Sequence, residues 1–517
     1  MNLPLLFDTI SHLRTTQIFH QLKYRLIKPK LGNETATIES YNMKLTAPIV
    51  KPKCYNGGNT FTFLNISSSF QGWDMRDYGP LWTYNLNYMD WIEQEDITIN
   101  ECLKWIDLFI DELPNNHIGQ DPYPIALRII NWSKFFSKHP ECRNKRRNDS
   151  MYAQTLLLER KLEYHLLGNH LLEDGYALTI TAIYFHDKRL FQKASMLLCE
   201  QLNEQILPDG AHYEQSPMYH CIMLDRLLDC INFTENNILF DRQSAFTDFL
   251  CEKARAMLGH LQSIIYADSS IPLLNDSAYG IAPTPTQLFQ YAKMLGLSWD
   301  TIPLNECGYR KLVHGNVEAL TDIGNITANY QPGHSHADTF NYELRIDGNP
   351  IIVDTGISTY NKDDRRQYER STSAHNTVTI NKKNSSQVWG GFRLGKRARV
   401  SVSEDTPQNI IANHNGFGNN AIHQRKFSLN GNTFTIEDKI IGGATNAISY
   451  IHFAPNLQIQ IISTEDGIIK IGNTIMKIDH FRDITLSNNY VSTEYNRLLS
   501  TNVLEISFTK HLKYTIG

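Results

Sequence analysis

The sequence predicts a multidomain α+β protein, in which an N-terminal (α/α) toroid of helical hairpins precedes a C-terminal antiparallel β-sandwich. Two observations predict this order. From about Leu81 to Leu297 apolar residues recur at helical spacings, as in the run from Ile125 to Phe136. After Cys307 short apolar runs alternate with turn signals, which is typical of a sandwich. A chain of 517 residues is longer than a single hydrophobic core usually accommodates, so we expect separate domains. They are a helical lead 1–45, a toroid 46–306 and a sandwich 307–517.

The helical half is divided by short polar breaks. Pro208-Asp209-Gly210 is one such break, and Asp187-Lys188 is another. Short breaks between long helices make antiparallel hairpins, and several hairpins in series indicate a solenoid or a closed toroid. A basic helix is also expected in the lead, from Ser11 to Lys30. The expected helices of the toroid lie at about 151–167, 171–186, 189–206, 216–232, 242–265 and 284–296.

The second half carries the strand signals. Asp347-Gly348-Asn349 and Asn430-Gly431-Asn432 each separate two apolar runs, as hairpin turns do. Many short strands without a long helix favour a sandwich of about 200 residues. The expected strands are Asn341–Ile346, Pro350–Val353, Asn376–Ile380, Phe427–Leu429, Thr433–Asp438, Ile448–Phe453, Leu457–Ile462 and Val503–Phe508.

Bulk composition narrows the function classes. A net charge of -5 argues against a nucleic-acid binder, although a local basic cleft for an acidic substrate remains compatible with it. The eight cysteines are widely spaced without a Cys-x-x-Cys pair, so we expect reduced thiols rather than a disulfide framework. The start of the sequence has no evident signal peptide, and no apolar run reaches the roughly 20 residues of a membrane span. We therefore expect a cytoplasmic protein by default.

Two polar clusters lie at predicted helix starts. Asn169, in Gly168-Asn169-His170-Leu171-Leu172-Glu173, is interpreted either as an N-cap or as a functional amide. In the second cluster, Ser216 and Pro217 suit a helix start, as N-cap and first helical residue. That role does not explain the polar side chains that crowd around them, namely His212, Tyr213, Glu214, Gln215, Tyr219 and His220. Arg128, on an otherwise apolar helix, either snorkels to the surface or reaches a ligand.

Histidines and one aspartate in the second half form a candidate metal site. His334 and His336 are two residues apart, so on a strand they would share one face. His336, Asp354 and His375 offer two imidazoles and a carboxylate, a set that suits zinc with one open position. His334 would then remain for chemistry. The alternative is that these histidines only form hydrogen bonds within a strand core.

Five runs together resemble the heparinase II/III-like polysaccharide lyases. They are Asn169–Glu173, Glu214–His220, His334–Asp338, Asp354–Gly356 and Arg370–Thr377. The similarity extends from about Trp82 to Phe508. It implies an alginate-lyase-like helical domain followed by a heparinase II/III-like domain, and it is more specific for this fold than for the substrate. It implies β-elimination of a uronic-acid polysaccharide such as heparan sulfate or alginate. It also implies a zinc in the sandwich and makes a periplasmic location an alternative.

The resemblance implies roles for particular residues. Asn169, assisted by His170, would bind the C5 carboxylate and stabilise the enolate that develops there. Tyr219 would be the acid, and either Tyr219 or His334 the base; the choice between Tyr213 and Tyr219 stays open. A zinc with a structural task would be held by His336, Asp354 and His375. The expected substrate-binding residues are Arg128, Glu173, Tyr213, Glu214 and Arg370.

Two other function classes remain from the sequence. A toroid glycoside hydrolase needs two carboxylates flanking the bond, and Glu173, Glu214 and Asp209 are available. A non-catalytic carbohydrate-binding protein of exopolysaccharide production is the other alternative. The sequence specifies neither the polymer, its sulfation and epimer, endo or exo cleavage, nor the oligomeric state.

Overall fold

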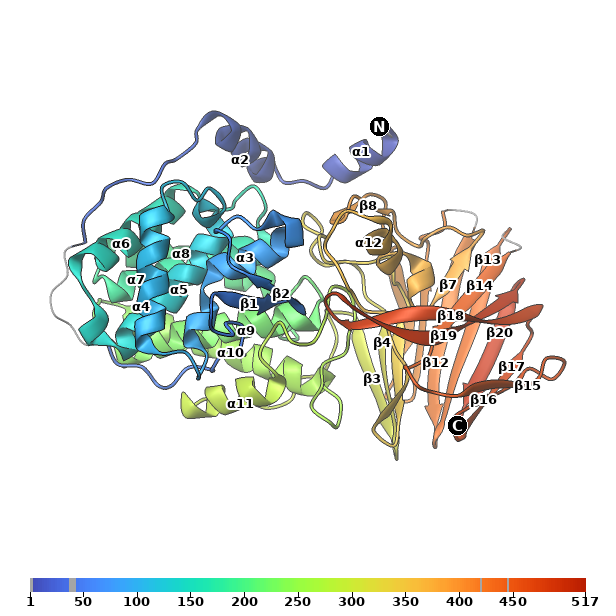
Figure 1. The fold of residues 1–517 in the computed structure, drawn as a ribbon. Coiled ribbons are helices and arrows are strands. Elements are labelled where there is room, and N and C mark those ends of the chain that lie inside the picture. Colours follow the sequence, from blue (N-terminus) through green and yellow to red (C-terminus); the bar gives the residue numbers. More distant parts are fainter. Residues whose placement is uncertain (1–2, 37–42, 419–420, 444–445) are drawn as a thin grey trace.

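The computed structural model describes residues 3–36, 43–418, 421–443 and 446–517. A helical part and a strand-rich part lie next to each other in it (Figure 1). The last helix of the helical part ends at Met294, and the first strand of the second part begins at Tyr309. This is the toroid-then-sandwich order that the sequence predicts, so the predicted fold class is confirmed. Residues 1–2 and 37–42 of the predicted lead 1–45 lie outside the described residues.

An N-terminal arm runs over both parts. It contains α1 (Leu3–Ile10) and α2 (Thr15–Leu26), which lie above the strand-rich and the helical part respectively in Figure 1. The Gln17 amide donates to the carbonyl oxygens of Leu166 and Tyr330, each at 3.3 Å, and thereby ties the arm to both parts. The Trp389 indole donates to the Thr9 hydroxyl at 3.1 Å. The arm is thus fixed across the boundary between the two parts.

The helical part has an inner and an outer set of helices. α5 and α7 are buried along nearly their whole length, whereas α4 and α8 bury one face only. This difference follows from the sequence. After its first two turns α7 carries apolar or small residues on all sides, whereas α8 has apolar residues on one face and charged residues on the other. The bounds are α3 (Pro80–Tyr88), α4 (Ile99–Glu112), α5 (Pro122–Lys138), α6 (Lys145–Arg160), α7 (Gly168–Tyr184), α8 (Lys188–Gln205), α9 (Pro217–Asn236), α10 (Gln243–Ile264) and α11 (Pro285–Met294).

Aromatic side chains fill the start of the helical core. Trp82, Trp91, Trp105 and Trp132 are all at most 1% exposed. A short hairpin, β1 (Thr60–Phe63) and β2 (Ile66–Ser69), contributes Phe61, whose ring lies 4.9 Å from Trp91. Edge-to-face aromatic pairs of this kind add to the stabilisation from buried area.

The strand-rich part consists mainly of three antiparallel sheets. The largest has the order β10-β11-β12-β13-β20-β17-β16-β15, the second β18-β19-β14-β7 and the third β3-β4-β5-β6. A bridge between Ile352 and Phe453 joins the third sheet to the second. The bounds are β3 (Tyr309–His314), β4 (Val317–Asp322), β5 (Tyr342–Ile346), β6 (Asn349–Ile352), β7 (Val378–Ile380), β10 (Val400–Asp405), β11 (Asn409–His414), β12 (Ala421–Asn430), β13 (Thr433–Gly442), β14 (Ala447–His452), β15 (Ile459–Ser463), β16 (Ile468–Ile471), β17 (Thr474–Asp479), β18 (Asp483–Glu494), β19 (Arg497–Phe508) and β20 (His511–Ile516).

Both predicted hairpin turns are confirmed. Asp347 and Gly348 have φ of 54° and 74° between β5 and β6, and Gly431 has φ of 54° between β12 and β13. A small helix α12 (Asp364–Glu369) and the two-residue strands β8 (Val388–Trp389) and β9 (Arg393–Leu394) lie on the connections near the helical part. These connections carry much of the candidate site.

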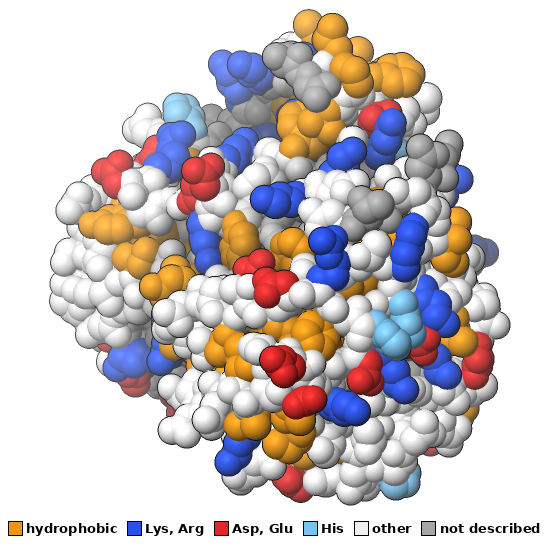
Figure 2. Space-filling view, turned by 90° about the vertical axis from the view of Figure 1, so that its right-hand side faces the viewer, with side chains coloured by type: hydrophobic (Ala, Val, Ile, Leu, Met, Phe, Trp, Pro, Cys, Tyr) orange, Lys and Arg blue, Asp and Glu red, His pale blue; other side chains and the backbone are white. Residues whose placement is uncertain are grey.

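The prediction of reduced thiols is confirmed, because all eight cysteines are free. No helix in the described part of the chain combines the length and apolar character that a bilayer crossing requires. On the face shown in Figure 2, acidic and basic side chains alternate without a broad field of one sign.

Candidate active site

A buried aspartate lies at the centre of the site. Asp276, in the connection between α10 and α11, is 0% exposed and accepts from His334 Nδ1 at 2.9 Å and from His336 Nε2 at 2.8 Å. Arg366 of α12 donates to both of its carboxylate oxygens, at 2.5 and 2.7 Å. Burial opposes the charge of Asp276, but the Arg366 guanidinium and the two histidines outweigh it and hold the pKa of Asp276 well below its ordinary value.

The two histidines converge, although not for the predicted reason. His334 and His336 lie in the irregular connection before β5 rather than on a strand, so the expectation of a shared strand face is wrong. They meet because each ring uses one nitrogen on a different oxygen of Asp276. With Nδ1 of His334 on that carboxylate, its Nε2 is left facing Asn169 at 3.4 Å. A ring held in this way has its Nε2 lone pair available as a base.

Tyr219 lies directly on His334. The ring centroids are 3.9 Å apart and the planes are 29° from parallel, and the Tyr219 hydroxyl is 3.3 Å from the Tyr360 hydroxyl. As predicted, Ser216 caps α9 by accepting from the backbone N–H of Tyr219, with Pro217 as first helical residue. Burial raises the pKa of the Tyr219 phenol above its ordinary value. The phenol is therefore protonated at neutral pH, which suits an acid better than a base.

Asn169 is the second residue of α7 and is held by Glu214. Its backbone N–H donates to Glu214 Oε1 at 3.0 Å, and its side-chain amide donates to Glu214 Oε2 at 2.9 Å. Because Leu167 is the residue at the N-cap position, the N-cap interpretation of Asn169 is wrong. Gly168 has φ of 62°, and a Cβ on it would lie 2.4 Å from Glu214 Oε1. A glycine there allows the carboxylate to approach the start of α7.

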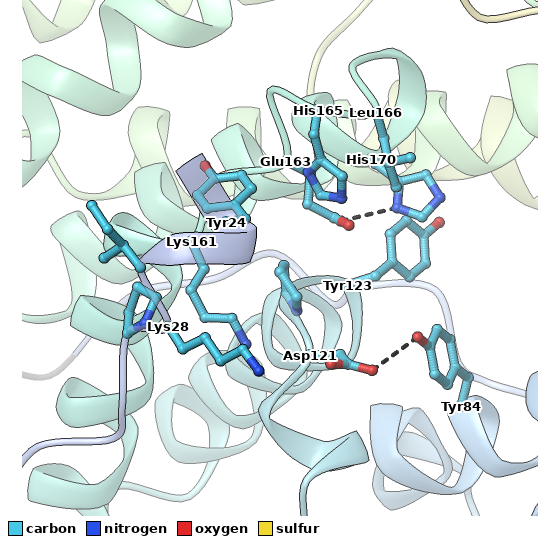
Figure 3. Close-up of a pocket in the computed structure, with 13 residues that line it drawn as sticks. Tyr24, Lys28, Tyr84, Asp121, Tyr123, Lys161, Glu163, His165, Leu166 and His170 are labelled. Atoms are coloured by element: carbon cyan, nitrogen blue, oxygen red, sulfur yellow. Dashed lines mark hydrogen bonds and ion pairs between the residues drawn. The ribbon is translucent and has the colours of Figure 1, made fainter. Parts of the chain in front are cut away.

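His170 faces a cavity beside this cluster. Its Nδ1 lies 2.9 Å from Glu163 Oε2, and its ring lies 4.6 Å from the ring of Tyr123 (Figure 3). Burial disfavours the charged imidazole, but the Glu163 carboxylate outweighs burial and raises the pKa of His170. The cavity has a volume of about 480 Å³ and lies between the end of α2, α3, the start of α5 and the segment 161–170. Since His170 follows Asn169, the cavity adjoins the group formed by Asn169, Tyr219 and His334.

Two family models match consecutive stretches of the chain. The model described as heparinase II/III N-terminus matches residues 149–296, and the one described as heparinase II/III-like, C-terminal, matches residues 297–515. The chain belongs to the heparinase II/III-like family. The predicted family is therefore confirmed.

Relatives and solved structures agree with this membership. A heparin-sulfate lyase of Bacteroides thetaiotaomicron is 24% identical in an alignment of length 331 that covers 55% of this chain and 46% of the relative. A heparin-sulfate lyase of Pedobacter heparinus is 22% identical in an alignment of length 430 that covers 73% of this chain and 62% of the relative. The chain thus spans about half to three fifths of the length of these relatives. A solved structure of heparinase III shares the fold, with a TM-score of 0.67 and 15% identity over 100% of this chain and 91% of that one.

Two of the five expected substrate-binding residues lie inside the helical part. Arg128 is 0% exposed, and its guanidinium donates to the carbonyl oxygens of Asn87 and Gly119, at 2.9 and 2.6 Å. Glu173 is also fully buried, with Arg226 Nε at 3.5 Å, and burial raises its pKa to about 7. Both side chains are 0% exposed, so neither is open to solvent in this arrangement. Arg128 does not snorkel to the surface, because its buried guanidinium binds main-chain carbonyl oxygens.

The other three expected substrate-binding residues, Tyr213, Glu214 and Arg370, contact other residues of the protein. Glu214 uses both oxygens on Asn169. Arg370 is 0% exposed and donates to the carbonyl oxygen of Ser335 at 2.9 Å, so it fixes the connection that carries His334. The Tyr213 hydroxyl lies 3.0 Å from the Tyr330 hydroxyl, whereas Tyr219 lies on His334. Glu214 thus holds Asn169 and Arg370 holds the connection that carries His334, while their contact with a substrate stays a prediction.

The predicted zinc ligands are only partly arranged for a metal. His375 Nδ1 lies 2.7 Å from Asp354 Oδ2, so Asp354 orients His375 rather than facing an open position. The rings of His336 and His375 are 5.2 Å apart, and among the described residues His336 Nδ1 and His375 Nε2 are buried without a hydrogen-bond partner. Imidazoles that bind zinc commonly have their other nitrogen on a carboxylate, as both do here. The two histidines therefore suit a metal, with Asp354 as a supporting carboxylate.

A different trio has its ligand-type atoms closest together. In the described ranges Asp209, His260 and Cys307 bring one such atom each within 4.8 Å of one another, a possible metal-binding triad. These groups already have internal partners, since Asp209 Oδ2 accepts from the backbone N–H groups of Asn305 and Cys307 at 3.0 and 2.9 Å. Burial also raises the pKa of the Cys307 thiol well above its ordinary value, which disfavours the thiolate that a metal needs.

Asp276, Arg366 and Tyr360 were not expected from the sequence. Asp276 had one usable signal: it lies in Asn275-Asp276-Ser277, inside the longest break between two predicted helices, 266–283. Long connections in compact domains are commonly functional. Arg366 and Tyr360 precede the Arg370 run, and their partners are distant along the chain: Asp276 is 90 residues from Arg366, and Tyr219 is 141 residues from Tyr360. Sequence spacing alone does not indicate such a pair.

Proposed function

We propose that this protein cleaves a uronic-acid-containing polysaccharide by β-elimination and leaves a 4,5-unsaturated uronate end. The observation that carries the proposal is the convergence of Asn169 and Tyr219, from the first turns of α7 and α9, with His334 from a connection of the strand-rich part. Elimination next to a uronate requires a group that neutralises the C5 carboxylate, a base that removes the C5 proton and an acid that protonates the leaving O4 atom. The three side chains supply these groups within one site.

The base in this proposal is His334 and the acid is Tyr219. His334 Nε2 removes the C5 proton, and Asp276 stabilises the imidazolium that forms, since it accepts from Nδ1 at 2.9 Å. The electron pair of the C5–H bond forms the C4=C5 double bond as the C4–O4 bond breaks. The Tyr219 hydroxyl gives its proton to O4. A proton then passes from the imidazolium to the phenolate, directly or through water, which restores both groups.

Asn169 supports the developing enolate. Its amide, held by Glu214, donates to the C5 carboxylate of the substrate, a fixed dipole that needs no reorganisation during the reaction. His170 carries a raised pKa, so its cationic form adds positive charge beside the same carboxylate. A zinc, when bound by His336 and His375, would rigidify the connection that carries His334, and the elimination itself uses the residues named above.

The substrate class to test first is a heparan-like glycosaminoglycan. The names of the two relatives reported above point to it, and alginate and other uronate polymers are the next candidates. The decisive experiment incubates the protein with a panel of these polymers and follows the ultraviolet absorbance of unsaturated uronate. Reaction in water-18O with mass spectrometry separates the alternatives, because hydrolysis incorporates solvent oxygen and elimination does not. Binding without either product would favour a non-catalytic carbohydrate-binding protein.

The three carboxylates that the sequence offered for a hydrolase, Glu173, Glu214 and Asp209, do not form a catalytic pair. Glu214 is used by Asn169, Asp209 accepts backbone N–H groups, and Glu173 is buried beside Arg226. A glycosidase needs one carboxylic acid and one carboxylate flanking the bond. These contacts favour elimination over hydrolysis.

A further inference from the structure

The cavity beside His170 is built largely by residues that precede both matched family regions. Tyr24 and Lys28 come from the N-terminal arm, and Tyr84, Asp121 and Tyr123 come from α3 and the start of α5. The matched regions begin at residue 149, so they supply only the wall formed by Lys161 to His170. At about 480 Å³ the cavity has the volume of a small-molecule site, for which about 300–1,000 Å³ is usual.

Two lysines of this cavity have no carboxylate partner. Lys161 is half-buried, and its Nζ donates to the carbonyl oxygen of Gln120 at 2.7 Å. Neither Lys161 nor the exposed Lys28 forms an ion pair with any described residue. In Figure 3 both side chains point into the cavity from the same wall, while Asp121 turns toward Tyr84, whose hydroxyl donates to it at 3.1 Å. Burial lowers the pKa of Lys161 although the Asp121 and Glu163 carboxylates attract its charge, so a further anion at this place would relieve an existing cost.

The opposite wall of the cavity is aromatic and leads to the proposed catalytic group. The rings of Tyr84 and Tyr123 flank the space shown in Figure 3, and Tyr123 contacts His170 with ring centroids 4.6 Å apart. The other carboxylate of the cavity, Glu163, is occupied by His170. Unpaired cations on one wall and tyrosine rings on the other suit a sugar ring that carries an acidic substituent.

We propose that this cavity binds the sugar residue next to the scissile bond and that Lys28 and Lys161 receive its anionic substituent, a carboxylate or a sulfate. This subsite rests on the proposed elimination, because its position relative to the scissile bond is defined by Asn169 and His170. The N-terminal arm is then part of the substrate site, since Lys28 lies just beyond the end of α2. Residues before 149 thereby determine which acidic sugar the protein selects.

The test compares three charge-removing variants of the full chain: Lys28→Gln, Lys161→Gln and the control Lys30→Gln. Lys30 is exposed, lies on the same arm two residues from Lys28 and does not line the cavity. Calorimetry measures the Kd for two tetrasaccharides of one uronate backbone, one sulfated and one not. We expect Kd to rise about threefold for Lys28→Gln and about tenfold for Lys161→Gln, and to stay unchanged for Lys30→Gln.

The outcomes separate the subsite from the reaction. A loss confined to the sulfated tetrasaccharide identifies sulfate as the bound group, and a loss for both identifies the carboxylate. Wild-type Kd values in both cavity variants, or an equal loss in Lys30→Gln, overturn the subsite. Lys28→Gln keeps the test valid if Lys161→Gln does not fold, because Lys28 is exposed. If the wild-type protein binds the sugars but forms no unsaturated product, the elimination fails while the Lys28 and Lys30 comparison still decides the subsite.

Discussion

The ring of His334 lies face to face with the ring of Tyr219, with centroids 3.9 Å apart. Tyr219 belongs to the first turn of α9, and His334 to a connection in the strand-rich part, 115 residues later. Asp276 holds Nδ1 of His334, so the imidazole cannot rotate away without breaking that bond. The proposed acid and base therefore form one rigid pair, whose geometry depends on the packing of the two parts of the chain.

Tyr219→Phe tests the acid assignment. The substitution removes one hydroxyl with little change in volume and keeps the ring on His334, so we expect kcat to fall by at least about 10²-fold with an unchanged thermal unfolding midpoint. The matched control is Tyr213→Phe, because the Tyr213 hydroxyl bonds to Tyr330 rather than facing His334. Steady-state kinetics and thermal unfolding measure both effects. Near-normal turnover in Tyr219→Phe would show that another group protonates O4.

Asp276→Asn tests whether Asp276 stabilises the site and supports the proposed base His334. Removing this charge leaves the buried Arg366 without its counterion, which costs about 3–5 kcal/mol of unfolding free energy. It also removes the carboxylate that stabilises the imidazolium of His334, so kcat falls by roughly 10²-fold or more. Asp268→Asn is the control, since Asp268 pairs with Arg345 at a site where it is half exposed, and we expect a loss below about 1 kcal/mol. Equal losses in the two variants, by denaturant unfolding, would contradict a central role for Asp276.

Gly168→Ala tests whether the close approach of Glu214 positions Asn169. A Cβ at Gly168 would lie 2.4 Å from Glu214 Oε1 and would displace the carboxylate that holds the amide. We expect a loss of stability of about 1–3 kcal/mol together with a loss of kcat. Gly58→Ala is matched in backbone strain, with φ of 56° and open space around it, so it should lose only stability. Full activity in Gly168→Ala would mean that Asn169 does not need Glu214.

Glu173→Gln should stabilise the protein at alkaline pH. Burial raises the pKa of Glu173 to about 7, above the ordinary value of 4.5, so the folded state binds its proton more tightly than the unfolded state does. Stability therefore falls as pH rises from about 4.5 to 7, and the full cost is present above pH 7. A neutral amide avoids this cost, and we expect a gain of roughly 1–3 kcal/mol at pH 8 that disappears near pH 4. Denaturant unfolding of both proteins at pH 8 and pH 4 measures this gain. A stability difference that does not depend on pH would contradict the raised pKa of Glu173.

The sequence predicted the order of the two parts and the helices of the toroid because their signals are local. The apolar repeat of α8 and the Asp347-Gly348 turn each depend on neighbouring residues. Asn169, Tyr219 and His334 were recognised as polar residues in the sequence, the family resemblance implied their roles, and the structure brings them together. Asp276 and Arg366 were missed because their pairing depends on how the α10–α11 connection packs against α12. The contacts of Arg128 with main-chain carbonyl oxygens were not foreseen, because an arginine with such contacts has the same sequence pattern as one that binds a ligand.

The final prediction concerns where a metal binds. His336 and His375 each have one buried nitrogen without a partner among the described residues, so we expect His336→Ala and His375→Ala to lower bound zinc and the thermal unfolding midpoint together. Cys307→Ser is the comparison, since Cys307 belongs to the other possible triad but has internal partners and a thiol that resists ionisation. Elemental analysis of the purified variants measures the zinc content. If zinc is lost in Cys307→Ser and kept in the two histidine variants, the metal site lies instead at the connection between the helical part and the sandwich.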